Sequence, residues 1–255
     1  MSAEPESAEG TSLRAFEAAK LLSSFTDFLT IALHSLLYHR GLYPAATFLT
    51  ARAYNLPVHQ SRYPKLCNWI NDAVAAVSAQ LQSRCVRHIA VVIHAPSSLD
   101  VLERWIFDVS SFPNWGPPLP LGGEDADDLE GDDDVAAAIA EAEEALNWTD
   151  INEALRGALR RIAYAAESLP NTPPGSTFTL AVELHDEAPA PIGHPQPWIP
   201  SQPDLQTPAP SKSNRGPARQ AASTTPVRAV RAGPLFFECW IEHAAAKSTP
   251  ENAKG

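Results

Sequence analysis

Cysteine is scarce in this sequence: its 255 residues include three, Cys67, Cys85 and Cys239, with no C-x-x-C pair. Three widely spaced cysteines do not make a disulfide framework, and they favour reduced thiols in an intracellular compartment. An uninterrupted run of about 18 apolar residues is also missing, so we expect no membrane span. The acidic, polar start MSAEPESAEG is unlike a signal or transit peptide.

Catalytic and metal-binding motifs are missing as well. The eight histidines stand singly, with no H-E-x-x-H, and the sequence contains no nucleophile elbow, P-loop or G-x-G-x-x-G. We expect His88 and His94, which lie in an apolar stretch, to be hydrogen-bonded structural histidines rather than metal ligands. The sequence therefore predicts no catalytic residue, no metal and no cofactor. An enzyme of unknown class is kept as a second alternative, which a pocket with convergent, perturbed carboxylates or histidines would favour.

The net charge of −11 comes from one stretch of the chain. Residues 124–144 contain eleven acids and no Lys or Arg, so the other 19 acids are balanced by the 19 bases. The stretch lacks the ligand spacing of a calcium loop, and a solvated charge run is the better explanation.

Basic side chains gather in a later segment, where no acid lies between Leu205 and Phe237: Lys212, Arg215, Arg219, Arg228 and Arg231. Solubility of a disordered loop is one explanation. Electrostatic contact with phosphates or with the chain's own acidic stretch is the other. We expect direct DNA contact to be weak or absent.

Apolar residues at helical spacing predict three helices. They cover residues 12–37, ended by Gly41, then 64–81, begun by Pro64, and 150–169. The third begins at Asp150, which has capping-box spacing to Glu153. Residues 135–146 have high helix propensity but a weak apolar face, and they form either a solvated helix or the lead-in to the third helix.

Four stretches are predicted to be strands: 88–94, 104–110, 176–185 and 234–242. The first is apolar on both faces and should be central, and its short connection makes 104–110 its antiparallel neighbour. In 176–185, Phe178, Leu180, Val182 and Leu184 alternate with polar or small residues, which is typical of a half-buried strand. Residues 43–58 are expected to connect elements through short extended pieces. Helices segregated against a mostly antiparallel sheet define an α+β fold.

Composition divides the chain into one domain with two long irregular segments. We expect disordered termini at 1–11 and 244–255, a domain over 12–243, an acidic disordered insertion at 112–134 and a proline-rich excursion at 199–230. A strand, a long excursion and a last strand suggest a C-terminal flap across the sheet, and we expect function to reside there.

Several stretches together resemble one family: FLTIALHSLLYHRGLYPAATF, YNLPVHQSRYPKLCNWINDAV, HIAVVIH, WIFDVS, LRGALRRI, NTPPGSTFTLAVELH and PWI. They are similar to HORMA-domain proteins, and within that family to the non-catalytic accessory subunit of translesion DNA polymerase zeta. The resemblance implies a HORMA fold, in which three helices pack on the sheet and a C-terminal safety belt locks a partner peptide. It also implies a nuclear, non-catalytic adaptor. Spindle-checkpoint and meiotic chromosome-axis HORMA adaptors are the first alternative.

The resemblance also implies a peptide-binding site. Tyr43 of LYP, Trp69 of NWI, Phe178 of STFT and Trp198 of PWI match positions where the family contacts a proline-containing peptide. The peptide adds a strand to the sheet edge, and aromatic rings suit proline. Core packing explains Phe178 equally well, whereas Trp198 is favoured as a belt anchor. Trp69 stands where the family usually has tyrosine.

Two further surfaces follow from the same resemblance. Glu238 and Trp240 match last-strand positions that contact the C-terminal domain of the scaffold translesion polymerase, and alternation places both on one face, which we expect to be exposed. Arg156 matches a helix arginine at a HORMA–HORMA dimer contact, for which an ordinary solvated arginine is an equal explanation. The implied partners are the catalytic subunit of polymerase zeta, through its peptide, and the scaffold polymerase. A HORMA–HORMA dimer and an AAA+ remodelling ATPase are further candidates, and no membrane partner is expected.

Overall fold

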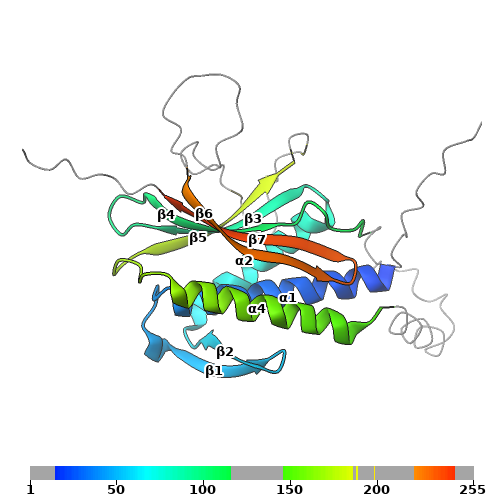
Figure 1. Ribbon diagram of the computed structural model, residues 1–255, viewed down its shortest axis with the longest axis horizontal. Helices are drawn as coiled ribbons and strands as arrows, with labels where there is room; N and C mark the ends of the chain where they lie inside the picture. The colour runs from blue at the N-terminus through cyan, green and yellow to red at the C-terminus, as the bar shows by residue number, and fades with distance from the viewer. Residues whose placement is uncertain (1–14, 116–145, 186–187, 189–197, 199–220, 245–255) are drawn as a thin grey trace, which may run out of the picture.

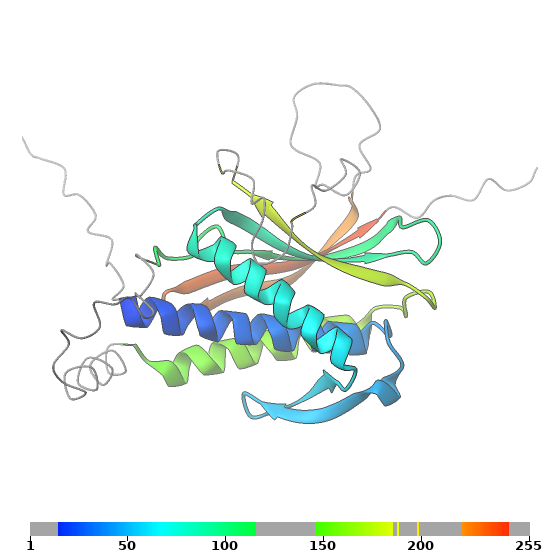
Figure 2. The ribbon, with the colours of Figure 1, turned by 180° about the vertical axis from the view of Figure 1, so that it is seen from behind.

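The computed structural model describes residues 15–115, 146–185, 188, 198 and 221–244. Three helices lie between a five-stranded sheet and a small two-stranded hairpin (Figures 1 and 2). The helices are α1 (Ala15–His39), α2 (Pro64–Gln82) and α4 (Trp148–Ser168). A short 3-10 helix, η1 (Ala45–Thr47), leads into the hairpin, which consists of β1 (Phe48–Ala53) and β2 (Leu56–Ser61).

The five-stranded sheet is antiparallel throughout, in the order β5-β3-β4-β7-β6. Its strands are β3 (Val86–His94), β4 (Val101–Asp108), β5 (Thr177–Leu184), β6 (Ala221–Ala232) and β7 (Leu235–Ala244). The prediction of an α+β fold is confirmed, as are the central position of β3 and its antiparallel pairing with β4. Helix α2 packs under β3, α4 packs under β6, and α1 contacts both helices.

Helix α1 forms the centre of the core. Its stripe of apolar residues at helical spacing is buried, and Phe25 and Phe28 contact the ring of Phe237 on β7. The helix ends where Gly41 adopts a φ of 64°. There the Leu42 N–H donates to the Leu37 carbonyl at 3.1 Å, which is the bond of a Schellman motif. By length and composition α1 could also span a bilayer, but 61% of that window is buried inside the domain.

Helix α4 begins earlier than the sequence predicted. Its N-cap is Asn147, whose side-chain oxygen accepts from the Asp150 N–H at 3.2 Å, while its amide donates to the Asp150 carboxylate at 2.8 Å. The reciprocal cap was therefore assigned one turn too late. With Asn147 as the N-cap, Trp148 joins the first turn of the helix, whereas Ile151, which is buried, is helical with either cap.

The core extends further along the chain than expected. We predicted that residues 112–134 could hold no core, and for 112–115 this is wrong. The Phe112 ring lies 4.7 Å from Phe25 and 5.7 Å from Trp115, and Trp115 is buried. These two aromatic rings close the end of the core next to α1. The rest of the acidic insertion (116–134), nearly all of the segment 135–146, expected to be a solvated helix or a lead-in to the third helix, and the termini 1–11 and 245–255 lie outside the described residues. Ala244, expected in the disordered C-terminus, is instead the last residue of β7.

Two strand pairs were missed. Within 43–58 the structure has the β1–β2 hairpin, whose two-residue turn, Tyr54-Asn55, has φ values of 49° and 56°. Positive φ at both turn positions is what a tight hairpin requires, and asparagine tolerates it. The excursion predicted for 199–230 is wrong in its last part, because β6 begins at Ala221. β6 is an edge strand with a bulge next to Pro226, so the proline does not interrupt the ladder.

A buried arginine joins three elements of the fold. Arg40, just after α1, pairs with Glu103 of β4 at 2.7 Å, and the two side chains are 3% and 5% exposed. Its other nitrogens donate to carbonyls at the end of α4, namely those of Ala166, Leu169 and Pro170. Since the last carbonyls of a helix have no intrahelical donor, Arg40 caps α4 and fixes the chain that leads to β5.

Candidate functional site at the edge of β5

The outer edge of β5 is open in the part of the chain that the structure describes. β5 pairs only with β3, so its other edge has a row of unpaired backbone groups. Its helix-facing side chains are only half-buried, whereas Ile89 and Ile93 of β3 are fully buried. The half-buried row consists of Phe178, Leu180, Val182 and Leu184. An open edge beside uncovered apolar side chains can accept an additional strand.

Three of the predicted peptide-binding residues meet at one end of this edge. Phe178 of β5 lies edge-on to Trp69 of α2, with ring centroids 5.1 Å apart, and to Tyr43 at 6.5 Å. Trp69 is 37% exposed, and the neighbouring Tyr63 is 47% exposed. Burial and then the proximity of Tyr63 raise the pKa of Tyr43, which keeps its phenol neutral. We call Tyr43, Tyr63, Trp69 and Phe178 the aromatic cluster.

Trp198 is half-buried and packs against the hydrophobic core. Its indole nitrogen is buried and has no hydrogen-bond partner among the described residues. Since most of the chain around it lies outside those residues, the structure does not bring Trp198 together with the aromatic cluster.

Glu238 and Trp240 share the face of the sheet that points away from the helices. Glu238 is exposed and Trp240 half-buried, whereas their neighbours Phe237, Cys239 and Ile241 are buried, so the expected alternation is confirmed. The Trp240 indole N–H donates to Glu242 at 3.1 Å, and its ring lies edge-on to His88, 5.6 Å away.

His88 stands at the centre of an ionisable group on this outer face. Its two nitrogens lie 2.8 Å from Glu183 of β5 and 3.5 Å from Asp108 of β4. Burial opposes its protonation, but the hydrogen bond and charge of Glu183, together with Asp108, raise the pKa of His88 above 6.5. The hydrogen bond from His88 is the main reason that the pKa of Glu183 is lowered. Burial raises the pKa of Asp108, but Ser110 and His88 lower it overall.

His94 is hydrogen-bonded as predicted. One ring nitrogen lies 3.0 Å from the Thr179 hydroxyl and the other 3.1 Å from the Leu99 carbonyl.

Arg156 lies on α4, where it forms a surface ion pair with Glu153 at 3.3 Å. Its side chain is 33% exposed, so it is available to a partner but also explained by this local pair.

Comparison with known proteins identifies the fold. The sequence model of the HORMA domain matches residues 22–219 of this chain. The chain belongs to the HORMA-domain family. Among solved structures, this HORMA domain is similar to a chain of the mitotic checkpoint complex, with a TM-score of 0.62, 17% identity and coverage of 88% and 99% of the two chains. It is also similar to Caenorhabditis elegans HTP-2, with a TM-score of 0.51, 12% identity and coverage of 89% and 87%.

Curated relatives of this HORMA domain come from two functional settings. The DNA polymerase zeta processivity subunit of Schizosaccharomyces pombe is 28% identical over 226 residues, which covers 88% of this chain and 92% of that protein. The mitotic spindle assembly checkpoint protein MAD2B of Gallus gallus is 29% identical over 64% of this chain and 65% of that protein. By their names, one relative is a subunit of a DNA polymerase and the other a spindle checkpoint protein.

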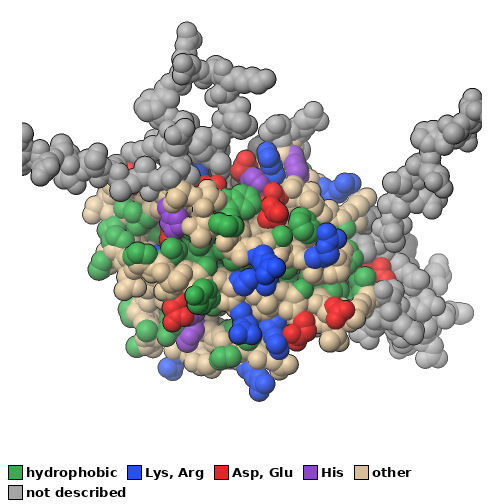
Figure 3. All heavy atoms as spheres, viewed as in Figure 1, with side chains coloured by type: hydrophobic (Ala, Val, Ile, Leu, Met, Phe, Trp, Pro, Cys, Tyr) green, Lys and Arg blue, Asp and Glu red, His purple; other side chains and the backbone are tan. Residues whose placement is uncertain are grey.

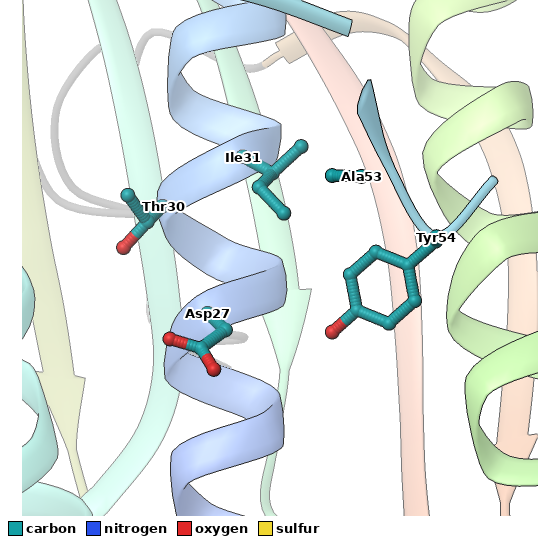
Figure 4. A pocket seen from close by; sticks show the side chains of 5 residues that line it. All are labelled: Asp27, Thr30, Ile31, Ala53 and Tyr54. Atoms are coloured by element: carbon teal, nitrogen blue, oxygen red, sulfur yellow. The ribbon is translucent and has the colours of Figure 1, made fainter. Parts of the chain in front are cut away.

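A shallow pocket lies between α1 and the tip of the β1–β2 hairpin (Figure 4). Its volume is about 320 Å³, and Asp27 and Tyr54 are its only ionisable lining residues. Burial raises the pKa of Asp27, and burial together with Asp27 raises the pKa of Tyr54 to about 12. A single carboxyl group beside a neutral phenol is not the convergent set of acids and bases that the enzyme alternative requires. In the described parts of the domain, no group of three His, Cys, Asp or Glu side chains could hold a metal.

Sequence reasoning missed two parts of these surfaces. Tyr63 joins the aromatic cluster from the N-cap of α2, and its place in RYP, directly before Pro64, could have drawn attention to it. The grouping of His88 with Asp108 and Glu183 depends on the register of three strands, for which the sequence contains no local signal.

Proposed function

We propose that this HORMA domain is a non-catalytic adaptor subunit of DNA polymerase zeta in translesion DNA synthesis. In this proposal it traps a short proline-containing peptide of the catalytic subunit. The observation that carries the proposal is the open edge of β5 beside the aromatic cluster. The fission yeast processivity subunit, which aligns over most of both chains, supports the choice of polymerase zeta.

The edge and the cluster would contribute differently to binding. A peptide strand added to β5 would gain main-chain hydrogen bonds, each with a net value of about 0.5–1.5 kcal/mol and little dependence on sequence. The aromatic cluster would supply specificity, because its rings offer flat faces to proline at one end of the strand.

The sheet topology supports a safety belt. The chain leaves β5 at one edge of the sheet and re-enters it as β6 at the other edge (Figure 1). The connection between them therefore passes from edge to edge, and a peptide on β5 would lie at its starting point. A peptide held under such a connection dissociates only when the connection opens, which favours a slow off-rate.

The remaining partners follow from the other surfaces. Glu238 and Trp240 on the outer face would contact the C-terminal domain of the scaffold translesion polymerase, so that one domain bridges two polymerases. Arg156 on α4 would serve a HORMA–HORMA dimer. An AAA+ ATPase would open the belt for peptide exchange, and the site of action would be the nucleus.

A checkpoint or chromosome-axis adaptor is the second candidate. It is favoured by the MAD2B relative and by the likeness in fold to HTP-2, whose structure contains a bound closure motif. Recovery of checkpoint proteins instead of polymerase subunits in a pulldown from the source organism would decide for this candidate.

The binding proposal is tested with synthetic peptides that tile the proline-containing segments of the polymerase zeta catalytic subunit. Trp69→Ala should weaken the best peptide by roughly 30-fold or more, as expected for an aromatic anchor. Tyr164→Ala is the matched control, because Tyr164 is 74% exposed on α4, away from β5. Equal affinities of wild type and Trp69→Ala would refute the role of the cluster.

The belt proposal is tested at Trp198. Trp198→Ala should abolish retention of the peptide while thermal unfolding remains cooperative. Because Trp198 packs against the core, the melt is measured first. Loss of the cooperative transition would show that Trp198 is a core residue and not a belt anchor.

A further inference from the structure

Two arginines meet where α4 packs against β6. Arg228 of β6 is the cross-strand partner of Cys239 of β7. Cys239 is buried on the helix-facing side of the sheet, in register with Phe237, which contacts α1, whereas Arg228 lies beside a bulge at the sheet edge and is exposed. Arg161 of α4 interacts electrostatically with both Cys239 and Arg228. Helix α4 packs against β6, so the two arginines lie on neighbouring elements at the edge of the sheet, within electrostatic range of each other. We call Arg161 and Arg228 the arginine pair.

The arginine pair has no counter-charge in the described part of the chain. Neither residue forms an ion pair there, and Nε of Arg161 is buried with no hydrogen-bond partner. Burial and the charge of Arg228 both lower the pKa of Arg161. By contrast, Arg40, Arg104 and Arg156 each pair with a carboxylate. Two adjacent like charges, one of them partly buried, are unfavourable unless an anion joins them.

The helix has a feature that accommodates one of these guanidinium groups. Gly157 lies one turn before Arg161, and a Cβ at Gly157 would be 3.3 Å from Nη1 of Arg161. Glycine in the interior of a helix is less favourable than alanine, so its presence here needs a reason. The absent side chain leaves room for the guanidinium to lie against α4 beside Arg228. Figure 3 shows several Lys and Arg side chains over the region of α4, with Asp and Glu side chains beside some of them.

We propose that the arginine pair is a carboxylate-binding site whose occupant is the chain's own acidic segment, residues 124–144. That segment has eleven acids and no bases, and the rest of the chain has no net charge. It joins α4 at the N-cap, Asn147. Arg161 lies along the same helix, roughly 20 Å from that end at 1.5 Å per residue. The acids of 124–134 can therefore reach the pair.

The chemistry of the pair favours a carboxylate of the same chain. Guanidinium groups bind carboxylates through two parallel N–H···O bonds, and a tethered segment is present at a high effective concentration. Nucleic acid is the less suitable occupant, because phosphate backbones are held by basic side chains spread over many contacts.

A double-mutant cycle on stability tests the proposal in the full chain. One change replaces the eight acids of 124–134 by Asn or Gln, and the other is Arg161→Gln with Arg228→Gln. Each change alone should lower the folding equilibrium constant. The loss of folding free energy in the combined variant should be smaller than the sum of the two separate losses. We expect a coupling of roughly fivefold or more at low salt that fades at high salt. Arg52→Gln with Arg62→Gln, two exposed arginines at the hairpin, is the matched control and should show no coupling.

A spin label locates the occupant directly. Ala126→Cys is labelled in a chain whose native cysteines are replaced, and paramagnetic broadening of the Arg161 side-chain N–H signal is recorded by NMR. Broadening within one chain, lost when the arginine pair is changed, is the expected result. In the double-mutant cycle, absence of coupling or equal coupling for the control pair would overturn the proposal. In the spin-label experiment, broadening that occurs only when labelled and unlabelled chains are mixed would also overturn it, because the occupant would then be a second copy. The proposal would also be overturned if the Arg161 side-chain N–H signal shifted when an oligonucleotide was added but was not broadened by the spin label at position 126.

Discussion

Removing Arg40 should destabilise this domain more than any surface change, because its guanidinium has four acceptors. It lies 2.7 Å from Glu103 Oε1 and donates to the carbonyls of Ala166, Leu169 and Pro170 at 3.0, 3.3 and 2.7 Å. In Arg40→Met, methionine fills much of the space but donates to none of these oxygens. The Glu103 carboxylate is then buried without a partner, which costs about 3–5 kcal/mol. The unpaired carbonyls at the end of α4 add to this cost, but not independently of it.

A second variant removes the Glu103 carboxylate that Arg40→Met leaves buried and unpaired. In Arg40→Met with Glu103→Leu, the buried carboxylate is gone and only the unpaired carbonyls remain, at about 1–3 kcal/mol. The double variant should therefore be more stable than Arg40→Met alone. Glu103→Gln keeps an acceptor for Nε, and we expect it to cost less than Arg40→Met.

Equilibrium unfolding in urea measures these differences, with thermal unfolding as a second readout. A loss of 3–5 kcal/mol corresponds to a decrease in melting temperature of about 6–20 °C in a domain of this size. A cost below about 1 kcal/mol for Arg40→Met would refute the assignment of a buried ion pair. A double variant no more stable than Arg40→Met would show that the carbonyls, not the carboxylate, dominate.

Two further outcomes follow from the ionisable surfaces. Because the folded pKa of His88 is raised, its charge stabilises the fold fully below 6.5, and this contribution is lost as the pH rises through the folded pKa. Glu183, with a lowered pKa, loses its contribution as the pH falls below its ordinary value of 4.5. His88→Gln should therefore reduce urea stability most between pH 4.5 and 6.5, and a difference that does not vary with pH would contradict this. Arg156→Glu should convert any dimer to monomer in sedimentation while the melting temperature changes little, since its exposed pair with Glu153 contributes about 0.3–0.5 kcal/mol.

The helices and central strands could be predicted because their signals are local. The periodicity of α1 and α2 and the continuous apolar run of β3 follow from which faces are buried. The elements that were missed depend on long-range context. Pro226 argues against a strand until β6 is known to be an edge, and the Tyr54-Asn55 turn lacks the glycine that usually marks a tight hairpin.

The candidate site divides in the same way. Tyr43, Trp69 and Phe178 come from three distant segments, and only motif similarity could group them before the structure placed their rings in contact. Neither periodicity nor spacing predicts Arg161 beside Arg228, because their proximity depends on which strand α4 covers and on the register of β6 with β7. The sequence shows which side chains could bind a partner, but only the fold shows which of them lie next to one another.

The position of β7 has a consequence for how the protein is made. β7 is the last strand that the structure describes, yet it pairs with β4, where Trp105 faces Ile241 and Phe107 faces Cys239. All four of these side chains are buried. Until β7 has left the ribosome, the β4 edge has no partner and Phe25 and Phe28 of α1 lack their contact with Phe237, so the core is completed only after β7 emerges. Completion of the sheet should be slow, because the β4–β7 pairing joins residues that are far apart in the sequence and requires closure of a long chain. Premature termination before β7 should yield an aggregation-prone chain rather than a partly active one.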